Sequence, residues 1–374
     1  MDFNLTEQEK MLQSLAKDFA ANEILPQAAE IDRTGEFPRK LAKEIGKHGF
    51  QGLPFPEGYG GSDAGYTSFI LVLEQLCQAS VAVGAIMAVN TVPEEGIYRF
   101  GTEEQKQRML KPLAKGKWLG GIGFTEADTG SDPRLIKTVA RHDGKGYVIN
   151  GQKMFMSLAP VLDVVLLFAR YEDGLNAYII ESSSPGFTVQ EVLETMGLRG
   201  MGTSIVNLDD VYVPEENLIG KAGQGFDILL DAISVERMSV AMQGVAVAQA
   251  ALDLSLDYAR QREASGRPIS RMQAIQQQLA EMAARIEAAR WLVYRTAFLR
   301  DQGQANIQYE ASMAKLFASQ VAVEVTRMAM QVHGSFGTMK SLPVERLYRD
   351  AKMTEIYVGI SEVHRSIIAS RLIQ

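Results

Sequence analysis

The spacing of hydrophobic and polar positions changes twice along this 374-residue chain. From residue 1 to about 115, apolar residues recur at helical spacing, with breaks at the segment GEFP, at the glycine-rich segment 54–66 and near Pro93. From about 117 to 222 the apolar runs shorten and are separated by Gly, Pro, Asp and Ser, which is typical of strands. The predicted strands are 118–124, 147–157, 163–170, 177–182, 187–192 and 204–213.

Long helical runs return in the last part of the chain. They are predicted at 224–261, 271–301 and 305–334, with shorter runs to the end. Helices of this length fit a bundle, in which each helix buries an apolar face against its neighbours. The sequence therefore predicts a mainly α protein with an all-β insert. Its predicted domains are an N-terminal α-helical domain at 1–116, a middle all-β domain at 117–222 and a C-terminal helical bundle at 223–374.

Composition narrows the class of protein. With 46% hydrophobic and 22% charged residues the chain can bury a large core, and its net charge of −7 is spread over mixed acids and bases, so no basic stripe indicates a nucleic acid partner. Cys77 is the only cysteine, which excludes an intramolecular disulfide and indicates a reducing compartment. The histidines are too scattered to predict a metal site: His48, His142, His333 and His364.

The N-terminal segment and the hydropathy of the chain indicate where in the cell the protein is located. The first 20 residues carry acidic side chains from position 2 and are predicted to form a capped amphipathic helix instead of a targeting segment. We find no apolar run that approaches the roughly 20 residues of a membrane span. The sequence therefore predicts a cytoplasmic protein without membrane insertion.

Two segments carry candidate ligand-binding residues. GGIGFTEADTGSD (120–132) is rich in glycine, but strand follows strand here, which argues against a dinucleotide-binding turn. Its short polar side chains, Thr125 and Ser131 among them, can hydrogen-bond a planar ligand, and a well-capped turn is the alternative. In NGQKMFMS, Phe155 and Ser157 are expected on one face of a strand, where they suit a ring system; core packing is the alternative.

Taken together, these segments make the chain similar to the acyl-CoA dehydrogenase family of flavoenzymes. The similarity runs over essentially the whole chain. It implies that the middle domain is a β-barrel insert (a middle β-barrel domain at 117–222) and that the C-terminal domain is a four-helix bundle. It also implies FAD as cofactor, an acyl-CoA thioester as substrate, electron-transfer flavoprotein as electron acceptor and a homotetramer. The segments that carry it are PEGYGG, GTEEQKQRMLKPLAKGK, GFTEADTGSD, INGQKMFMS, MGLRGMGTSIVNLDDVYVPEENLIG, RPISRMQAIQQQLAEM and QVHGSFGTMKSLPVERLYRDAKMTEIYVGISEVHR.

The resemblance assigns site residues by motif position. It implies that Phe124 and Thr125 touch the flavin ring, that Phe155 and Ser157 cover its other side and that Ser131 meets the pantetheine arm. The FAD tail is implied to reach a neighbouring subunit, which would supply Arg262 and Gln273, with Gln331 and Gly334 in the same layer. Ser265 stands where the family usually has Phe, and Ile360 where it usually has Thr, so adenine stacking and a hydrogen bond near the pyrophosphate are expected to be made differently.

The C-terminal segment EIYVGISEVHR departs from the family at one residue. Family members commonly carry here a Glu that removes the substrate α-proton, and this chain has Val358. The resemblance also implies that the backbone N–H at this position binds the thioester oxygen, and a backbone donor does not depend on the side chain. Val358 is therefore expected to contribute its N–H, and Tyr357 and Gly359 are expected to contact the substrate.

Another carboxylate can supply the base. In a subset of the family the base lies on a long helix of the C-terminal domain, at the position of Glu236. Its neighbours at helical spacing are apolar or small, so Glu236 is predicted to point inward, where desolvation raises its pKa toward the range of a general base. A structural ion pair is the alternative. Arg237 is expected to meet CoA phosphates or the flavin environment.

These residues predict the α,β-dehydrogenation of an acyl-CoA thioester. Glu236 would remove the pro-R α-proton while the β-hydrogen leaves as hydride to FAD, giving a trans-2-enoyl-CoA. Ala85, Ala88 and Val92 are expected to line the acyl pocket, and their small size suits a branched, cyclic or medium chain. The alternatives are the enoyl-CoA reductase direction, an FAD-containing lyase or desulfinase-like relative, and a non-catalytic FAD-bound scaffold.

Overall fold

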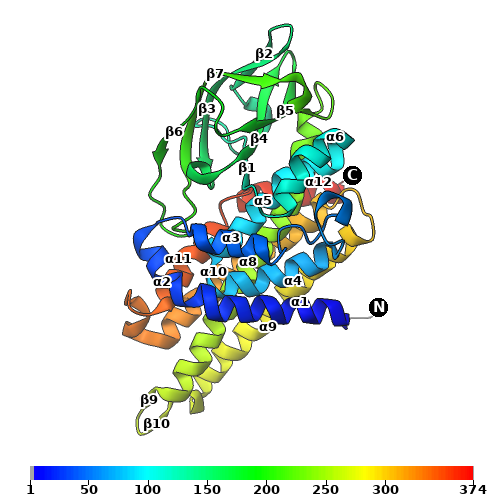
Figure 1. Cartoon of the computed structure of the whole chain (residues 1–374). Coiled ribbons are helices and arrows are strands. Elements are labelled where there is room, and N and C mark those ends of the chain that lie inside the picture. The colour runs from blue at the N-terminus through cyan, green and yellow to red at the C-terminus, as the bar shows by residue number, and fades with distance from the viewer. Residues whose placement is uncertain (1–3, 374) are drawn as a thin grey trace.

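The structure, a computed structural model, describes residues 4–373 and consists of a β-rich domain that stands on a body of helices (Figure 1). Residues 1–3 and 374, which the predicted domain ranges include, lie outside the described residues. The order of helical, β-rich and helical parts along the chain agrees with the sequence prediction.

The N-terminal part is helical, and its first helix has a capping box. The Thr6 hydroxyl accepts a hydrogen bond from the Glu9 N–H at 3.2 Å, and the Glu9 carboxylate accepts one from the Thr6 N–H at 2.7 Å, as predicted for a capped helix. The helices of this part are α1 (Glu7–Phe19), α2 (Ala28–Thr34), α3 (Arg39–Lys47), α4 (Gly65–Ala79), α5 (Val81–Phe100), α6 (Glu103–Gln105) and α7 (Lys111–Ala114).

The predicted break near Pro93 is wrong, because α5 runs through this proline. Proline removes one helical hydrogen bond, but α5 is buried against α8 and strand β1 (Gly120–Gly123), and tertiary packing stabilises the helix. A Cβ atom on Gly120 would lie 2.5 Å from Cγ of Pro93. The glycine therefore lets the strand approach the proline ring.

The middle part forms one bent sheet. The strands pair in the order β6-β7-β3-β2-β4-β5-β8, and β1 pairs in parallel with β4. Among the described residues β6 and β8 do not pair, so hydrogen bonds do not close the predicted barrel. The short strands β2 and β8 were not predicted. After β1 the strands are β2 (Val139–His142), β3 (Gly146–Met156), β4 (Val164–Tyr171), β5 (Gly174–Glu181), β6 (Phe187–Val192), β7 (Ser204–Pro214) and β8 (Leu218–Ile219).

The C-terminal part is a bundle around α8 (Gly225–Gln261), which packs against α4, α5, α9 and α10. By length and composition α8 is apolar enough to cross a membrane, which the sequence prediction overlooked, but 72% of its apolar window is buried in the protein. It is therefore a core helix. The other helices are α9 (Gln273–Asp301), α10 (Gln308–His333), α11 (Pro343–Thr354) and α12 (Ser361–Ile373), and a two-stranded hairpin of β9 (Glu263–Ala264) and β10 (Arg267–Pro268) follows α8.

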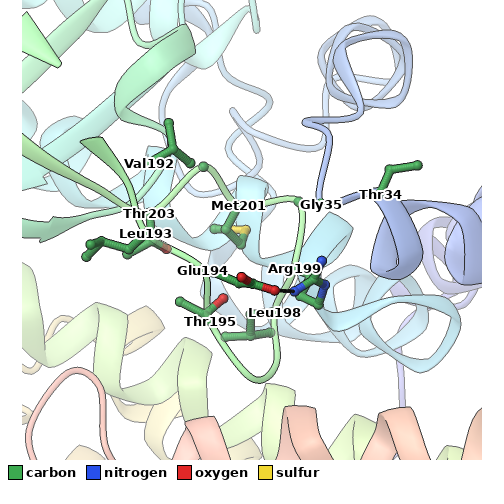
Figure 2. A pocket seen from close by; sticks show the side chains of 12 residues that line it. Thr34, Gly35, Val192, Leu193, Glu194, Thr195, Leu198, Arg199, Met201 and Thr203 are labelled. Atoms are coloured by element: carbon green, nitrogen blue, oxygen red, sulfur yellow. Dashed lines mark hydrogen bonds and ion pairs between the residues drawn. The ribbon is translucent and has the colours of Figure 1, made fainter. Parts of the chain in front are cut away.

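The loop between β6 and β7 ties the sheet to both helical parts. Its Leu198 N–H donates to the Asp350 carboxylate on α11 at 2.7 Å, and its Arg199 Nε donates to the Asp32 carbonyl on α2 at 2.6 Å. Arg349 forms an ion pair with Asp32 at 2.6 Å, which joins α11 to α2. A cavity of about 230 Å³ lies between this loop and the end of α2 near Gly35 (Figure 2).

A buried ionic network joins the N-terminal and C-terminal helices. Arg300 on α9 contacts Glu95 on α5 and, at 3.1 Å, Asp231 on α8, and the Tyr66 hydroxyl donates to Glu95. Burial disfavours the charge of Arg300, but Glu95, Tyr66 and Asp231 outweigh this effect and raise its pKa. Arg300 is therefore a charged group inside the core.

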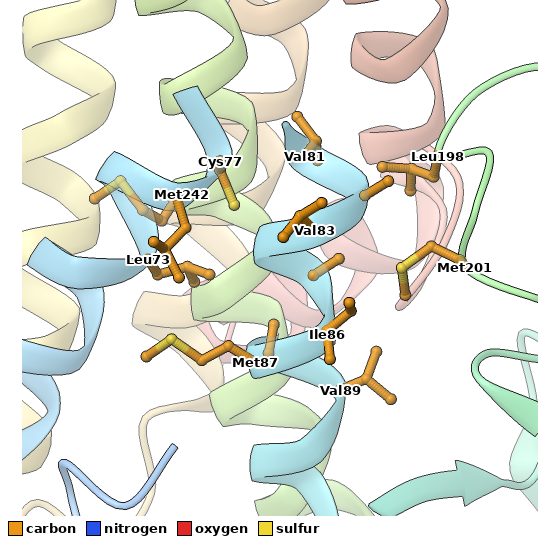
Figure 3. Close-up of a cluster of buried hydrophobic side chains, with 14 of the residues drawn as sticks. Leu73, Cys77, Val81, Val83, Ile86, Met87, Val89, Leu198, Met201 and Met242 are labelled. Atoms are coloured by element: carbon orange, nitrogen blue, oxygen red, sulfur yellow. The ribbon is translucent and has the colours of Figure 1, made fainter. Parts of the chain in front are cut away.

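The apolar core between α4, α5 and α8 contains Cys77 (Figure 3). A Cβ atom on Gly84 would lie 2.2 Å from the Cys77 sulfur, so glycine at this position gives the thiol its space. Burial raises the pKa of the Cys77 thiol well above its usual value. The thiol is therefore protonated and unreactive while the core is closed.

Candidate active site

The turn between α11 and α12 has an unusual backbone conformation. Val358 has a φ of 56° and Gly359 a φ of 98°. Left-handed backbone is rare for a β-branched residue, and such strain persists only where the surroundings hold it. Among the described residues the Val358 N–H donates no hydrogen bond, so it is available to a ligand.

Three buried side chains hold this turn. The Gly359 carbonyl accepts hydrogen bonds from Nζ of Lys315 at 2.6 Å and from Nε2 of His364 at 3.0 Å. The Tyr357 hydroxyl donates to Oε1 of Gln243 on α8. The turn is therefore fixed from α8, α10 and α12 at once.

Glu236 lies on α8, two helical turns before Gln243, and is only 6% exposed. Burial raises its pKa to about 7, an effect that the charge of Arg237 reduces. No cation of the described chain forms an ion pair with Glu236, so the alternative of a structural ion pair finds no support. The charge of Glu236 contributes to the raised pKa of Tyr357, and the same helix contacts the turn through the hydrogen bond between Gln243 and Tyr357.

Arg237 is also buried. Burial lowers its pKa to about 10, although the charge of Glu236 acts in the opposite direction. Its Nε and Nη1 atoms have no hydrogen-bond partner within the part of the chain that the structure describes. Its charge lowers the pKa values of Lys315 and His364, the two residues that donate to the Gly359 carbonyl of the turn.

The predicted flavin-contacting residues lie at the ends of two strands. Phe124 and Thr125 follow β1, while Phe155 lies near the end of β3 and is 60% exposed. Ser157 lies in the turn after β3, and a β-bulge with a φ of 55° at Phe155 interrupts the strand alternation on which the sequence argument relied. Within residues 4–373 the hydroxyls of Thr125 and Ser157 form no hydrogen bond, so an exposed ring and free hydroxyls are available to a planar ligand.

A buried ion pair supports these strand ends. Nζ of Lys153 lies 2.8 Å from Oε1 of Glu126 and 3.4 Å from the Phe124 carbonyl. The Glu126 carboxylate also accepts hydrogen bonds from the N–H and hydroxyl of Thr138. Burial lowers the pKa of Lys153 to about 8, and Glu126 opposes this effect. Ser131 is exposed in the loop after β1.

The four residues expected at the FAD tail lie far from these strands. Arg262 contacts the ring of Phe336 at 5.8 Å beside the β9–β10 hairpin, at the opposite end of the molecule from the sheet (Figure 1). All four are exposed: Arg262, Gln273, Gln331 and Gly334. One chain therefore does not bring the two predicted groups of FAD contacts together.

Sequence reasoning missed the side chains that support the site. Lys315, His364 and Gln243 hold the C-terminal turn, and the Lys153–Glu126 pair holds the strand ends. One signal was present for Lys315, because it stands four residues after Ala311 and three before Ala318, on the apolar face of its helix.

Comparison with known proteins identifies the family. Models of the acyl-CoA dehydrogenase N-terminal, middle and C-terminal domains match residues 6–117, 121–211 and 223–373. An acyl-CoA dehydrogenase of Bacillus subtilis is 43% identical over 99% of both chains, and a caffeyl-CoA reductase–Etf complex subunit of Acetobacterium woodii is 36% identical over 99% of both. The structure of butyryl-CoA dehydrogenase from Megasphaera elsdenii superposes on this one over 100% of both chains, with a TM-score of 0.98 and 35% sequence identity.

The three-domain fold and the three matching domain models define a flavin-dependent oxidoreductase. The chain belongs to the acyl-CoA dehydrogenase family. It is an FAD-dependent enzyme that acts on acyl-CoA thioesters. The exposed Phe155 ring and the free hydroxyls of Thr125 and Ser157 fit an isoalloxazine ring, which needs both stacking and edge hydrogen bonds.

Proposed function

We propose that Glu236 is the general base of an acyl-CoA α,β-dehydrogenation that yields a trans-2-enoyl-CoA. The observation that carries this proposal is the burial of Glu236 beside the turn without an ion-pair partner among residues 4–373. A carboxyl group with a pKa near the working pH takes up a proton most effectively. Val358 at the family's usual base position cannot do so, because its side chain has no titratable group.

The turn supplies the second part of the chemistry. Proton removal leaves negative charge on the thioester oxygen, and a fixed backbone N–H stabilises such charge. The free N–H of Val358 has this role in the proposal, and Tyr357 and Gly359 shape the same wall of the substrate site. FAD, when bound, accepts the β-hydrogen as a hydride. Its ring would be held by Phe124, Thr125, Phe155 and Ser157. Ser131 would contact the pantetheine arm of the substrate, and the buried guanidinium of Arg237 would face the negative charge of the bound ligands.

Flavin bleaching tests this function. Anaerobic addition of straight, branched and cyclic acyl-CoAs should remove the yellow absorbance of the oxidised flavin with at least one of them. Because Glu236 acts only when deprotonated and burial raises its pKa to about 7, the reduction rate should rise from about pH 6 and level off above about pH 8. A flavin that no acyl-CoA in the panel reduces, or a rate independent of pH, would contradict the proposal.

The reduced enzyme should transfer its electrons to electron-transfer flavoprotein. A relative that covers the same length is a subunit of a caffeyl-CoA reductase–Etf complex, which supports this partner. The same relative favours a second candidate direction, the reduction of an enoyl-CoA by a reduced partner. The same residues serve that direction, with Glu236 returning the proton to the α-carbon.

We also propose that the enzyme is a cytoplasmic homotetramer with FAD sites shared between subunits. The single cysteine, a buried free thiol, supports a reducing compartment. The β9–β10 hairpin, which Arg262 precedes and Gln273 follows along the chain, lies at the opposite end of the molecule from the sheet (Figure 1), and this separation supports a shared site.

Dilution tests the shared site. If the partner supplies Arg262 and Gln273, dissociation of the subunits should release FAD, because the predicted contacts of these two residues with the FAD tail are then lost. Sedimentation with absorbance detection measures subunit mass and bound flavin together. A monomer that retains FAD tightly would contradict the shared site.

A further inference from the structure

Lys315 is a fully buried lysine, and within residues 4–373 the only hydrogen bond of its side chain goes to a backbone carbonyl. It lies on α10 and donates to the Gly359 carbonyl at 2.6 Å. No carboxylate of the described chain pairs with it within 4 Å. Burying a lysine without a paired carboxylate costs free energy of folding, so a structural role alone does not account for a lysine at this position.

The carbonyl that Lys315 holds directly follows a strained residue. Val358 has a φ of 56°, a conformation that is strained for a β-branched residue. Without an external restraint the turn would relax toward negative φ, and the direction of the Val358 N–H would change with it. His364 donates to the same carbonyl at 3.0 Å and adds a second restraint.

We infer that Lys315, assisted by His364, is a positioning residue that holds the C-terminal turn in the conformation in which the Val358 N–H meets the thioester oxygen. This inference rests on the proposed role of that N–H. Lys315 contacts the Gly359 carbonyl and acts through the backbone of the turn.

The surrounding charges agree with a positional role. Burial and the charge of Arg237 lower the pKa of Lys315 to about 7, although Glu355 acts in the opposite direction. Burial and the charges of Lys315 and Arg237 lower the pKa of His364 to about 3, so His364 is neutral. An amine donates a hydrogen bond whether it is charged or neutral, so the restraint on the Gly359 carbonyl persists in both protonation states.

The experiment replaces Lys315 in the FAD-loaded enzyme and uses acetoacetyl-CoA as the probe. The α-carbon of this thioester is acidic, and binding of the enolate oxygen by the turn lowers the pKa at which the bound probe forms its enolate. In Lys315→Met we expect flavin content to be retained, flavin reduction by a substrate acyl-CoA to slow about 10- to 100-fold, and the pKa of the bound probe to rise by about one unit.

Relief of the backbone strain provides a specific rescue. Glycine adopts positive φ without cost, so Lys315→Met combined with Val358→Gly should recover part of both losses, judged against Val358→Gly alone. Lys352→Met is the matched control, because Lys352 is an exposed lysine near the same turn that pairs with Glu355 at 2.6 Å. We expect it to behave as the parent.

Two results would overturn the inference. A folded, FAD-containing Lys315→Met enzyme with the parent's reduction rate and probe pKa would show that the turn does not need Lys315. If Val358→Gly does not restore the reduction rate and the probe pKa of Lys315→Met in part, Lys315 acts through its charge and not through the backbone of the turn. If Lys315→Met does not fold, His364→Leu removes the other donor to the same carbonyl, and a probe pKa unchanged in that variant likewise overturns the inference.

Failure of the inference can be distinguished from failure of the proposed function. Bleaching of the parent enzyme by an acyl-CoA, together with its loss in Glu236→Gln, tests the base and leaves Lys315 unchanged. If the parent enzyme passes that test and Lys315→Met changes neither the reduction rate nor the probe pKa, the proposed function stands and only the positioning role of Lys315 is rejected.

Discussion

Glu236→Gln should slow flavin reduction by an acyl-CoA by at least about 10²- to 10⁴-fold, the contribution that general-base catalysis typically makes. The amide has almost the same shape as the carboxylate, so fold, FAD content and acyl-CoA binding should be retained. Glu236 is buried and forms no ion pair within residues 4–373, so no ionic contact of the fold is broken. Rapid mixing with absorbance detection of the flavin measures the reduction rate directly.

The neighbouring turn supplies a control for this prediction. Val358→Glu, added to Glu236→Gln, returns a carboxylate to the position where the family commonly has its base and should recover part of the rate. The recovery should be incomplete, because Val358 has a φ of 56° and a carboxylate on this turn approaches the α-carbon in another geometry. A Glu236→Gln enzyme that reduces its flavin as fast as the parent would show that another residue is the base.

Arg300→Met should destabilise the protein by about 3–5 kcal/mol, because removing one partner of a buried pair leaves an uncompensated charge. Arg300 is the cation that contacts Glu95 in the core, and it also pairs with Asp231 at 3.1 Å. Burial already raises the pKa of Glu95, and without Arg300 this carboxyl group should take up a proton or weaken the contact between α5 and α9. The urea midpoint at fixed protein concentration measures the loss.

Two variants complete this test. Arg365→Met removes an exposed arginine that pairs with Glu362 at 3.2 Å and should change the free energy of unfolding by less than about 1 kcal/mol. Arg300→Met with Glu95→Gln removes both charges of the buried pair, so it should cost less than Arg300→Met alone. A single Arg300→Met variant as stable as the parent would show that the network contributes nothing to stability.

The sequence predicted the long elements well because their patterns are local. The runs at 224–261 and 271–301 became α8 and α9, which begin within two residues of the predicted positions and end on them, since uninterrupted helical spacing over many residues leaves few alternatives. Pro93 was misread because tertiary packing of α5 outweighs the local signal of a helix break. The strand β2 has only four residues, too few for an alternating pattern to stand out.

The site was predictable only in part, for a physical reason. The inward direction of Glu236 follows from the spacing along one helix and could be read from the sequence. The contact of Lys315 with Gly359 joins residues 44 positions apart, and that of Tyr357 with Gln243 joins residues 114 apart, so no local pattern contains them. The positive φ of Val358 was equally hidden, because valine disfavours it and only those distant contacts maintain it.

The Cys77 thiol, which occupies the space left by Gly84, can report how often the helical core opens. Because Cys77 is the only cysteine of the chain and is fully buried between α4 and α5, a thiol reagent can react only during excursions that separate these helices. The rate at which the thiol is labelled therefore measures how often these helices separate, and no engineered probe is needed. If acyl-CoA binding stabilises the closed core, the same thiol should become slower to label as substrate is added.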